Sequence, residues 1–363
     1  MKRGMRGLVP LLFLMACGGG SKQAAAPVLA PANPVAVSKL AQGVDAAKSK
    51  DGRRQAIELL QKAVEADGQL WEGRYNLGVL LAEAGDLATA EKQLAEAHRL
   101  APNAEDVVVA LGEVRRRLGD FDGAAEVLGA FVKANPQATL ARTALVTSLR
   151  EAGEIDKAIK EAQEALIRNA NDPYALSELA LAQLERGEID TAELLSKEAL
   201  KAEPPRAVAE RTAGLISLKR GDDAVAFRHF QRAGELDPDD TTARINIGVV
   251  LLRAGVYDRA ATELKAVVDA DPDDTDAAVA LAAALRGKAK RDGAGFSESE
   301  RLLKGVLERE PKNISALFNL AVLYADHMKR PSEAEPLFKR FLSAAPDKHP
   351  ARAEAERFLS AKK

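Results

Sequence analysis

Few residues of this 363-residue sequence are of the types that carry out chemistry. There is one cysteine, and the four histidines stand far apart, without the spacing of a metal-binding helix. We interpret these histidines as surface residues: His98, His229, His327 and His349. Two Asp-Pro-Asp-Asp runs, at 237–240 and 271–274, look like calcium ligands but lack the glycine and closing glutamate of a calcium loop. The sequence therefore predicts no metal site, no cofactor and no catalytic group.

The composition points in the same direction. Lys and Arg number 52 against 54 Asp and Glu, a net charge of −2, so nothing favours nucleic acid as a partner. Apolar residues make up 47% of the chain, enough for a large core, whereas aromatic residues make up only 4%, too few for a large β-sheet protein. The abundance of Ala, Leu, Glu, Lys and Arg favours helix. We expect a helical protein that is not an enzyme and has no small-molecule substrate.

The single cysteine stands where its position carries meaning. Three positive charges near the start are followed by an apolar run over 8–16, which is too short to span a bilayer and fits a secretory signal. The run ends Leu14-Met15-Ala16-Cys17-Gly18, which resembles the bacterial lipobox. That resemblance implies cleavage before Cys17 and a lipid on its sulfur. An ordinary signal peptide or an uncleaved anchor is the alternative.

The segment after the cysteine reads as a tether. Residues 17–36 are rich in Gly, Ala and Pro and have no helical period. With residues 1–16 as the signal peptide, we expect an outer-membrane lipoprotein that faces the periplasm, because Gly18 follows the cysteine where the inner-membrane sorting signal of enteric bacteria has Asp. The inner membrane is the alternative location.

The remainder of the chain repeats with a period of 34 residues. Three residue types mark the period, and Pro misses it once, at Ala170. The positions are Gly at 85, 119, 153, 187, 221 and 255, Ala at 56, 90, 124, 158, 192, 226 and 260, and Pro at 102, 136, 204, 238 and 272.

A 34-residue period with these residues resembles the tetratricopeptide repeat. The best unit is 71–104, which contains Tyr75-Asn76-Leu77-Gly78, Gly85-Asp86, Ala90, Leu94, Ala97 and Pro102. The resemblance implies an all-α, right-handed superhelical solenoid of helix-turn-helix units. It also implies that the first helix of each unit lines a groove that binds other proteins.

Each recurring residue has a physical reason. A small residue in the first helix and an alanine in the second allow the two helices to pack closely. The grid glycine between them provides a tight turn. Proline ends the second helix, and Asp or Asn near it caps the next first helix, which is our interpretation of the two acidic runs.

We count nine units over 37–348, followed by a capping helix at 349–363. The first unit lacks the Leu-Gly pair, the eighth has five extra residues around 287–297, and the ninth replaces its turn glycine with the stretch 327–331. A polar-faced final helix is expected, because the last repeat would otherwise expose its apolar face.

One part of the groove is predicted to be apolar. In the units over 173–274, positions 9 and 12 of each first helix are aliphatic, with an aromatic residue, an isoleucine and two arginines beside them. These groove residues are Tyr174, Leu181, Leu184, Arg211, Leu215, Leu218, Ile245, Val249, Leu252 and Arg253. They form either a slot for a partner's segment or the packing between successive first helices.

Charged residues also recur in the groove. Position 13 reads Glu83, Arg117, Glu151, Glu185, Lys219 and Arg253, which predicts a ladder of opposite charges between neighbouring units. The run 115–117 is three arginines, which either bind an anion or complement the negative end of their own helix.

These features together predict a membrane-anchored, periplasmic scaffold or assembly factor for a multiprotein machine of the bacterial envelope. The resemblance to repeat-containing lipoproteins points to type IV pilus, gliding-motility, secretion or outer-membrane assembly systems. The partners would be proteins of such a complex, and the lipid would hold the chain at the membrane. A regulator of an envelope enzyme, such as a peptidoglycan synthase, is the alternative function.

Overall fold

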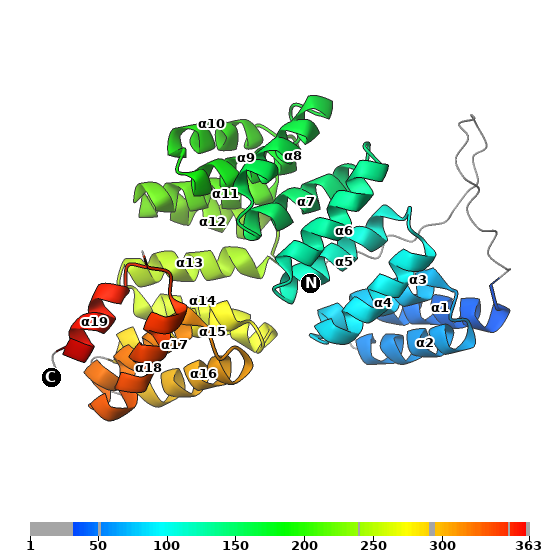
Figure 1. Ribbon diagram of the computed structural model, residues 1–363. Helices are drawn as coiled ribbons and strands as arrows, with labels where there is room; N and C mark the ends of the chain where they lie inside the picture. The colour runs from blue at the N-terminus through cyan, green and yellow to red at the C-terminus, as the bar shows by residue number, and fades with distance from the viewer. Residues whose placement is uncertain (1–31, 50–51, 239, 290–294, 348, 361–363) are drawn as a thin grey trace. The chain divides into compact units, whose positions relative to one another are not determined.

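The computed structural model describes residues 32–49, 52–238, 240–289, 295–347 and 349–360, and these contain helices and no β-strand (Figure 1). The predicted all-α fold is therefore confirmed. In order, the helices are α1 (Pro34–Ala47), α2 (Arg53–Ala66), α3 (Trp71–Glu83), α4 (Leu87–Leu100), α5 (Glu105–Arg117), α6 (Phe121–Ala134), α7 (Thr139–Glu151), α8 (Ile155–Arg168), α9 (Pro173–Arg186), α10 (Ile189–Ala199), α11 (Ala207–Arg220), α12 (Asp223–Leu236), α13 (Thr241–Arg253), α14 (Tyr257–Ala270), α15 (Thr275–Ala289), α16 (Phe296–Arg309), α17 (Ile314–Val322), the π-helix η1 (Leu323–His327), α18 (Pro331–Ala344) and α19 (Arg352–Ser360).

The chain divides into two compact units, Met1–Ala199 and Leu200–Lys363. The first contains α1 to α10 and the second α11 to α19. Within each unit the helices follow one another as pairs, and each helix contacts the next in sequence. We call the odd-numbered helices up to α17 the first helices of their pairs. This arrangement agrees with nine repeats and a C-terminal helix.

The grid glycines make the turns within the pairs. Six of them have a positive φ, between +71° and +94°, which is the left-handed region that side chains other than glycine rarely adopt. These residues are Gly85, Gly119, Gly153, Gly187, Gly221 and Gly255. The predicted role of these glycines is confirmed.

The small residues of the first helices make the close contacts within the pairs. A Cβ atom added at Gly214 would lie 2.4 Å from the Phe230 ring, and one added at Gly248 would lie 2.5 Å from Leu264. Both partners come from the second helix of the same pair and are fully buried. The aliphatic or aromatic side chain thus occupies the space that glycine leaves.

The first repeat contains a small residue that the 34-residue grid does not reveal. A Cβ atom on Gly43 would lie 2.8 Å from Leu60, the same kind of contact that Gly78 makes with Leu94. Leu60 and Leu94 are 34 residues apart, but Gly43 and Gly78 are 35 apart. The loop between α1 and α2 is longer than the usual turn, and this allows the helix pair to keep its packing despite the shift.

Two segments have bounds that differ from those predicted from the sequence. The linker was expected to extend to residue 36, but α1 begins at Pro34, because Asn33 accepts a hydrogen bond from Val35 N and proline fits the first helical position. Cys17, the signal peptide 1–16 and most of the linker lie outside the described residues. The capping helix begins at Arg352 rather than at 349, and its Phe358 ring packs 4.7 Å from that of Phe338.

The ninth repeat turns without glycine. After α17 the chain continues as the π-helix η1, and Lys329 then takes the left-handed conformation, with φ +54°. Pro331 starts the next helix. A π-helix accommodates extra residues within a helix, which explains how this repeat keeps its pairing without the grid residue.

A matched pair of glycine substitutions tests the close contacts. Gly214→Ala should lower the free energy of unfolding by about 1–3 kcal/mol, because the new methyl group meets the Phe230 ring. Gly305→Ala, inside α16 with no atom within 4 Å of the new Cβ, should raise it by about 0.5–1 kcal/mol. Urea unfolding followed by circular dichroism measures both. Equal effects would contradict the packing argument.

Candidate protein-binding surface

Three neighbouring first helices in the first unit share one face, which carries charged residues toward the carboxyl ends of the helices. α7 contacts both α5 and α9, and residues three or four apart on each helix share a face. On α7 this face consists of Leu140, Thr143, Thr147 and Arg150. On α5 it consists of Asp106, Val109, Glu113 and Arg116, and on α9 of Tyr174, Glu178, Leu181 and Glu185. We call this set the α5–α7–α9 face.

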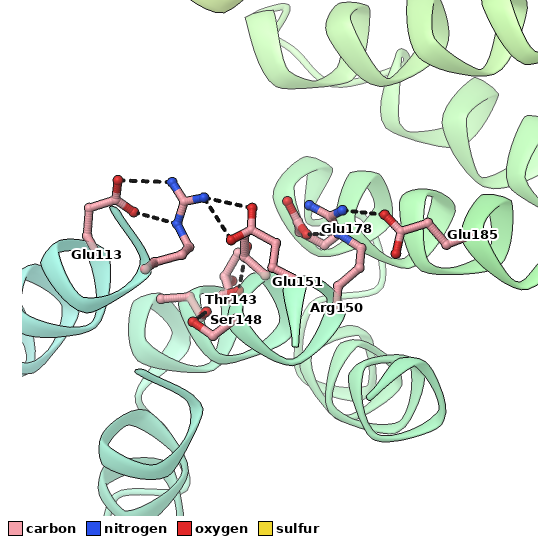
Figure 2. Close-up of polar contacts among 10 residues, drawn as sticks. Glu113, Thr143, Ser148, Arg150, Glu151, Glu178 and Glu185 are labelled. Carbon is pink, nitrogen blue, oxygen red and sulfur yellow. Dashed lines mark hydrogen bonds and ion pairs between the residues drawn. The ribbon is translucent and has the colours of Figure 1, made fainter. Parts of the chain in front are cut away.

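Arg116 joins α5 to α7. Its guanidinium donates hydrogen bonds of 3.0 Å to both carboxylate oxygens of Glu113 and bonds of 2.7 and 2.9 Å to those of Glu151 (Figure 2). Burial would lower the pKa of Arg116, but the hydrogen bonds and charges of the two glutamates outweigh it and hold the pKa above its ordinary value. Arg116 and Glu151 therefore form a charged connection between two neighbouring repeats.

Arg150 joins α7 to α9 in the same way. It pairs with Glu178, at 3.3 Å, and with Glu185 (Figure 2). Only 15% of the Arg150 side chain and 12% of that of Glu178 are exposed. Burial again opposes the charge of Arg150, and the two glutamates again raise its pKa above the ordinary value. Such a pair is costly to break, because either partner would remain as a largely buried charge.

The predicted charge ladder exists, but with different partners. Glu151 and Glu185 pair with an arginine at position 12 of the preceding unit, not with a residue at position 13. Arg117 instead donates to the carbonyl of Ala82, and Arg253 pairs with Asp223 at 3.0 Å. The expected pairing between residues at position 13 is therefore wrong for these residues. The arginine at position 12 of one unit instead pairs with the glutamate at position 13 of the next, which is 35 residues farther along the sequence.

The three consecutive arginines do not form an open anion site. Arg115 pairs with Glu91 at 3.1 Å and donates to the carbonyl of Gly123, while Arg116 is bound as described above. Arg117 complements the carboxyl end of a helix, but that helix is α3, not its own α5. The prediction that an arginine of this run complements the negative end of a helix is thus correct for Arg117. The prediction that this helix is its own is wrong.

The structure divides the predicted groove residues between the two units. In the first unit, Tyr174 is exposed, whereas Leu181 and Leu184 are half-buried, all on α9. The others lie in the second unit.

In the second unit, Leu215 and Leu218 pack against a buried cluster of Ala226, Phe230 and Val250. Ile245 and Leu252 pack against the larger core of that unit. These contacts support the packing interpretation of the stripe in the second unit. Val249 is half-buried on α13. A slot for a partner stays a prediction.

The two predicted groove arginines of the second unit are both ion-paired. Arg211 bonds to Asp240, and Arg253 bonds to both oxygens of Asp223 at 3.1 Å. Each arginine thus connects to an acidic residue of another element in its unit. Neither is a bare cation beside the apolar residues.

Leu140, which is not among the groove residues predicted from the sequence, is an exposed apolar residue beside Tyr174. Leu140 on α7 is 59% exposed and stands 34 residues before Tyr174, which is 48% exposed on α9. Both occupy position 2 of their units, on helices in contact. The 34-residue spacing from Tyr174, which is one of the predicted groove residues, is the sequence signal that indicates this position.

The acidic runs act as helix caps. Asp240 accepts a hydrogen bond from Thr242 N at 3.0 Å, and Asp274 accepts one from Ala277 N at 2.8 Å, at the starts of α13 and α15. This confirms the capping interpretation for these two residues. No group of three metal-ligating side chains is found among the described residues.

The four histidines are half-buried, so each is partly exposed at the surface and also contacts its own unit. His229 Nδ1 lies 2.7 Å from Glu210, and burial lowers the pKa of His98. The rings of His327 and His349 pack against the aromatic rings of Phe296 and Phe341. His229 thus makes a polar contact, and His327 and His349 make ring contacts, within their unit.

Comparison with known proteins agrees with the geometry. Sequence profiles described as Tetratricopeptide repeat match residues 40–105, 109–175, 143–208 and 284–349, and a second such profile matches 217–285. A search of curated proteins finds no significant match.

Solved structures of other proteins are similar to this chain, and one of them shares its fold over most of its length. A chain of the APC/C hetero-tetramer Cut9–Hcn1 is 15% identical, with a TM-score of 0.60 over 87% of this chain, and this chain covers 62% of its length. A tetratricopeptide repeat protein from Parabacteroides merdae is 19% identical, with a TM-score of 0.47, and the match covers 70% of this chain and 98% of that one.

The connection made by Arg150 can be measured against an exposed pair. Arg150→Met should lower the free energy of unfolding by about 1.5–3 kcal/mol, because Glu178 stays largely buried without its partner. Arg54→Met, which removes the exposed pair with Glu58, should cost less than about 0.5 kcal/mol. Chemical unfolding of both variants decides. If Arg150→Met costs no more than Arg54→Met, the connection does not stabilise the array.

Proposed function

Because the chain belongs to the tetratricopeptide repeat family, we propose that it is a lipid-anchored scaffold that assembles a multiprotein machine of the bacterial cell envelope. Proteins with this fold generally serve as protein–protein interaction scaffolds, and the fold is typically non-catalytic. The scaffold role rests on the family. The envelope location and the lipid anchor are the proposal.

One observation carries the anchoring. The only cysteine of the chain stands at the position of a lipobox, and a segment rich in Gly, Ala and Pro separates it from the first helix at Pro34. Two or more acyl chains hold a protein stably at a membrane, where one does not. No helix within the described residues is long and apolar enough to span a bilayer. The attachment that we propose is a lipid on the Cys17 sulfur, which rests on the lipobox residues 14–18.

The repeats support the assembly role. Nearly all of the described structure consists of helix pairs, and the first helices offer a surface along which a partner can bind. A tether over residues 18–33, about 16 residues before α1, would have a root-mean-square reach of roughly 20–24 Å, which would keep the repeats near the membrane without burying them. The systems that fit are type IV pilus, gliding-motility, secretion and outer-membrane assembly machines, with the protein in the outer membrane facing the periplasm.

Substitution of the cysteine tests the anchor. Cys17→Ser should move the protein from the membrane fraction to the soluble fraction of the periplasm, because the serine oxygen does not receive the lipid. Fractionation followed by immunoblotting measures the shift, with the wild-type chain as control. A Cys17→Ser protein that remains in the membrane fraction would contradict the lipobox.

Capture of partners tests the assembly role. The wild-type chain, purified from detergent-solubilised membranes, should retain a secretin, a motility protein or a component of a barrel-assembly or secretion complex. Retention of a cell-wall synthase instead would favour the regulator of an envelope enzyme.

A further inference from the structure

At the amino ends of α7 and α9, the α5–α7–α9 face carries two exposed apolar side chains, while Asp106 occupies the equivalent position on α5. These apolar residues are Leu140, on the first turn of α7, and Tyr174, on the first turn of α9. About half of each residue is exposed. Because the two residues occupy equivalent positions of helices in contact, they stand next to one another on the face. Adjacent exposed apolar side chains on a protein surface mark a contact site more often than single ones do.

The middle of the face offers few polar groups to a partner. The hydroxyl groups of Thr143 and Thr147 donate to carbonyls of their own helix, at 3.1 and 3.3 Å. Leu181 lies half-buried on α9 at the position that corresponds to Thr147. The apolar end at Leu140 and Tyr174 is thus continued toward the carboxyl ends of the helices by side chains without a free donor proton.

The opposite end of the face is acidic. Arg116 and Arg150 are surrounded by Glu113, Glu151, Glu178 and Glu185, so two guanidiniums face four carboxylates, which leaves a formal charge of −2. Both arginines already bind two carboxylates each and have little capacity for an added anion. Glu113 and Glu185 are the most exposed of the four carboxylates. A cation brought by a partner would be attracted, and an anion repelled.

We propose that the α5–α7–α9 face binds a segment of a partner protein that carries an apolar anchor and, farther along, lysine or arginine. The apolar side chains contact Leu140 and Tyr174, and the cations contact Glu113 and Glu185. Ten residues separate Leu140 from Arg150 on α7, a distance of about 15 Å along the helix axis. An extended segment covers this distance in four or five residues at about 3.3 Å each. The proposal rests on the scaffold role and names the chemistry of the partner.

The charge of the face excludes other classes of partner at this site. A nucleic acid or an anionic lipid surface would bring negative charge to four glutamates and find both arginines occupied. An acidic protein segment would meet the same repulsion. The basic and apolar segment is the partner whose two parts both find their complements.

Synthetic peptides test the chemistry with the full chain, purified in detergent. The first peptide has leucine and phenylalanine at one end and two lysines four or five residues away, and the second has glutamates in place of the lysines. Fluorescence anisotropy should show that the lysine peptide binds and that added salt weakens it. The glutamate peptide should bind at least about tenfold more weakly. No binding of the lysine peptide at about 1 mM, or equal binding of the two peptides, would overturn the proposal.

Variants locate the site on the surface. Leu140→Ser combined with Tyr174→Ser should weaken binding of the lysine peptide by about tenfold or more, because the apolar anchor loses its contacts. Glu113→Gln combined with Glu185→Gln should weaken it and reduce its salt dependence. Ile167→Ser is the matched control, since Ile167 is 76% exposed on α8, outside the face. Binding that survives the first pair of substitutions, or that Ile167→Ser weakens equally, would overturn the proposal. Circular dichroism checks that each variant is folded.

Capture from solubilised membranes separates this inference from the scaffold role. A wild-type chain that retains a partner, together with a Leu140→Ser/Tyr174→Ser variant that retains it equally, would overturn the site and leave the scaffold role intact. A wild-type chain that retains no partner would count against the scaffold role itself, whatever the peptides show.

Discussion

The close approach of each first helix to its own second helix is the constraint on which the repeats depend. At Gly78, Gly214 and Gly248 the side chain of the partner helix fills the space where a Cβ atom would stand. The glycine turns then bring the second helix back over these contacts, because the positive φ allows the chain to reverse within a few residues. The pairs that pack in this way present their first helices to their neighbours in a similar manner, and the contacts between successive repeats recur.

Much of this structure follows from residues that recur at a fixed spacing. The period of 34 predicts the helix pairs, the glycine turns and the helix caps, since each needs only a local residue type at a given place. The partner of an arginine is a different matter, because it depends on the offset between neighbouring helices and on the length of the side chain. Arg116 and Arg150 reach the residue 35 places along, and no spacing rule along a single helix predicts this.

Departures from the period show where sequence reasoning stops. Gly43 makes the usual contact with Leu60 from one place off the grid, because the longer loop after α1 absorbs the difference. In the ninth repeat, Lys329 takes the conformation that glycine has elsewhere, after a π-helix that no repeated residue indicates. Among the candidate groove residues, Tyr174 is exposed, whereas Leu215 and Leu218 pack inward in the second unit. The sequence does not distinguish them, because the burial of a side chain depends on how neighbouring helices meet.

The arginine–glutamate connections also bear on how such a chain changes in length over evolution. The repeat over 139–172 contains both halves of the connection, Arg150 toward the following helix and Glu151 toward the preceding one. A gene duplication that copied this repeat in tandem would place Arg150 of one copy beside Glu151 of the next, which reproduces the pairing with Glu185 but not the one with Glu178, because Ala144 stands at that position. Loss of a repeat by unequal recombination would rejoin the same two groups. Within the three repeats over 105–206, the pairing of an arginine with a glutamate 35 residues along would thus be kept when one repeat is added or lost.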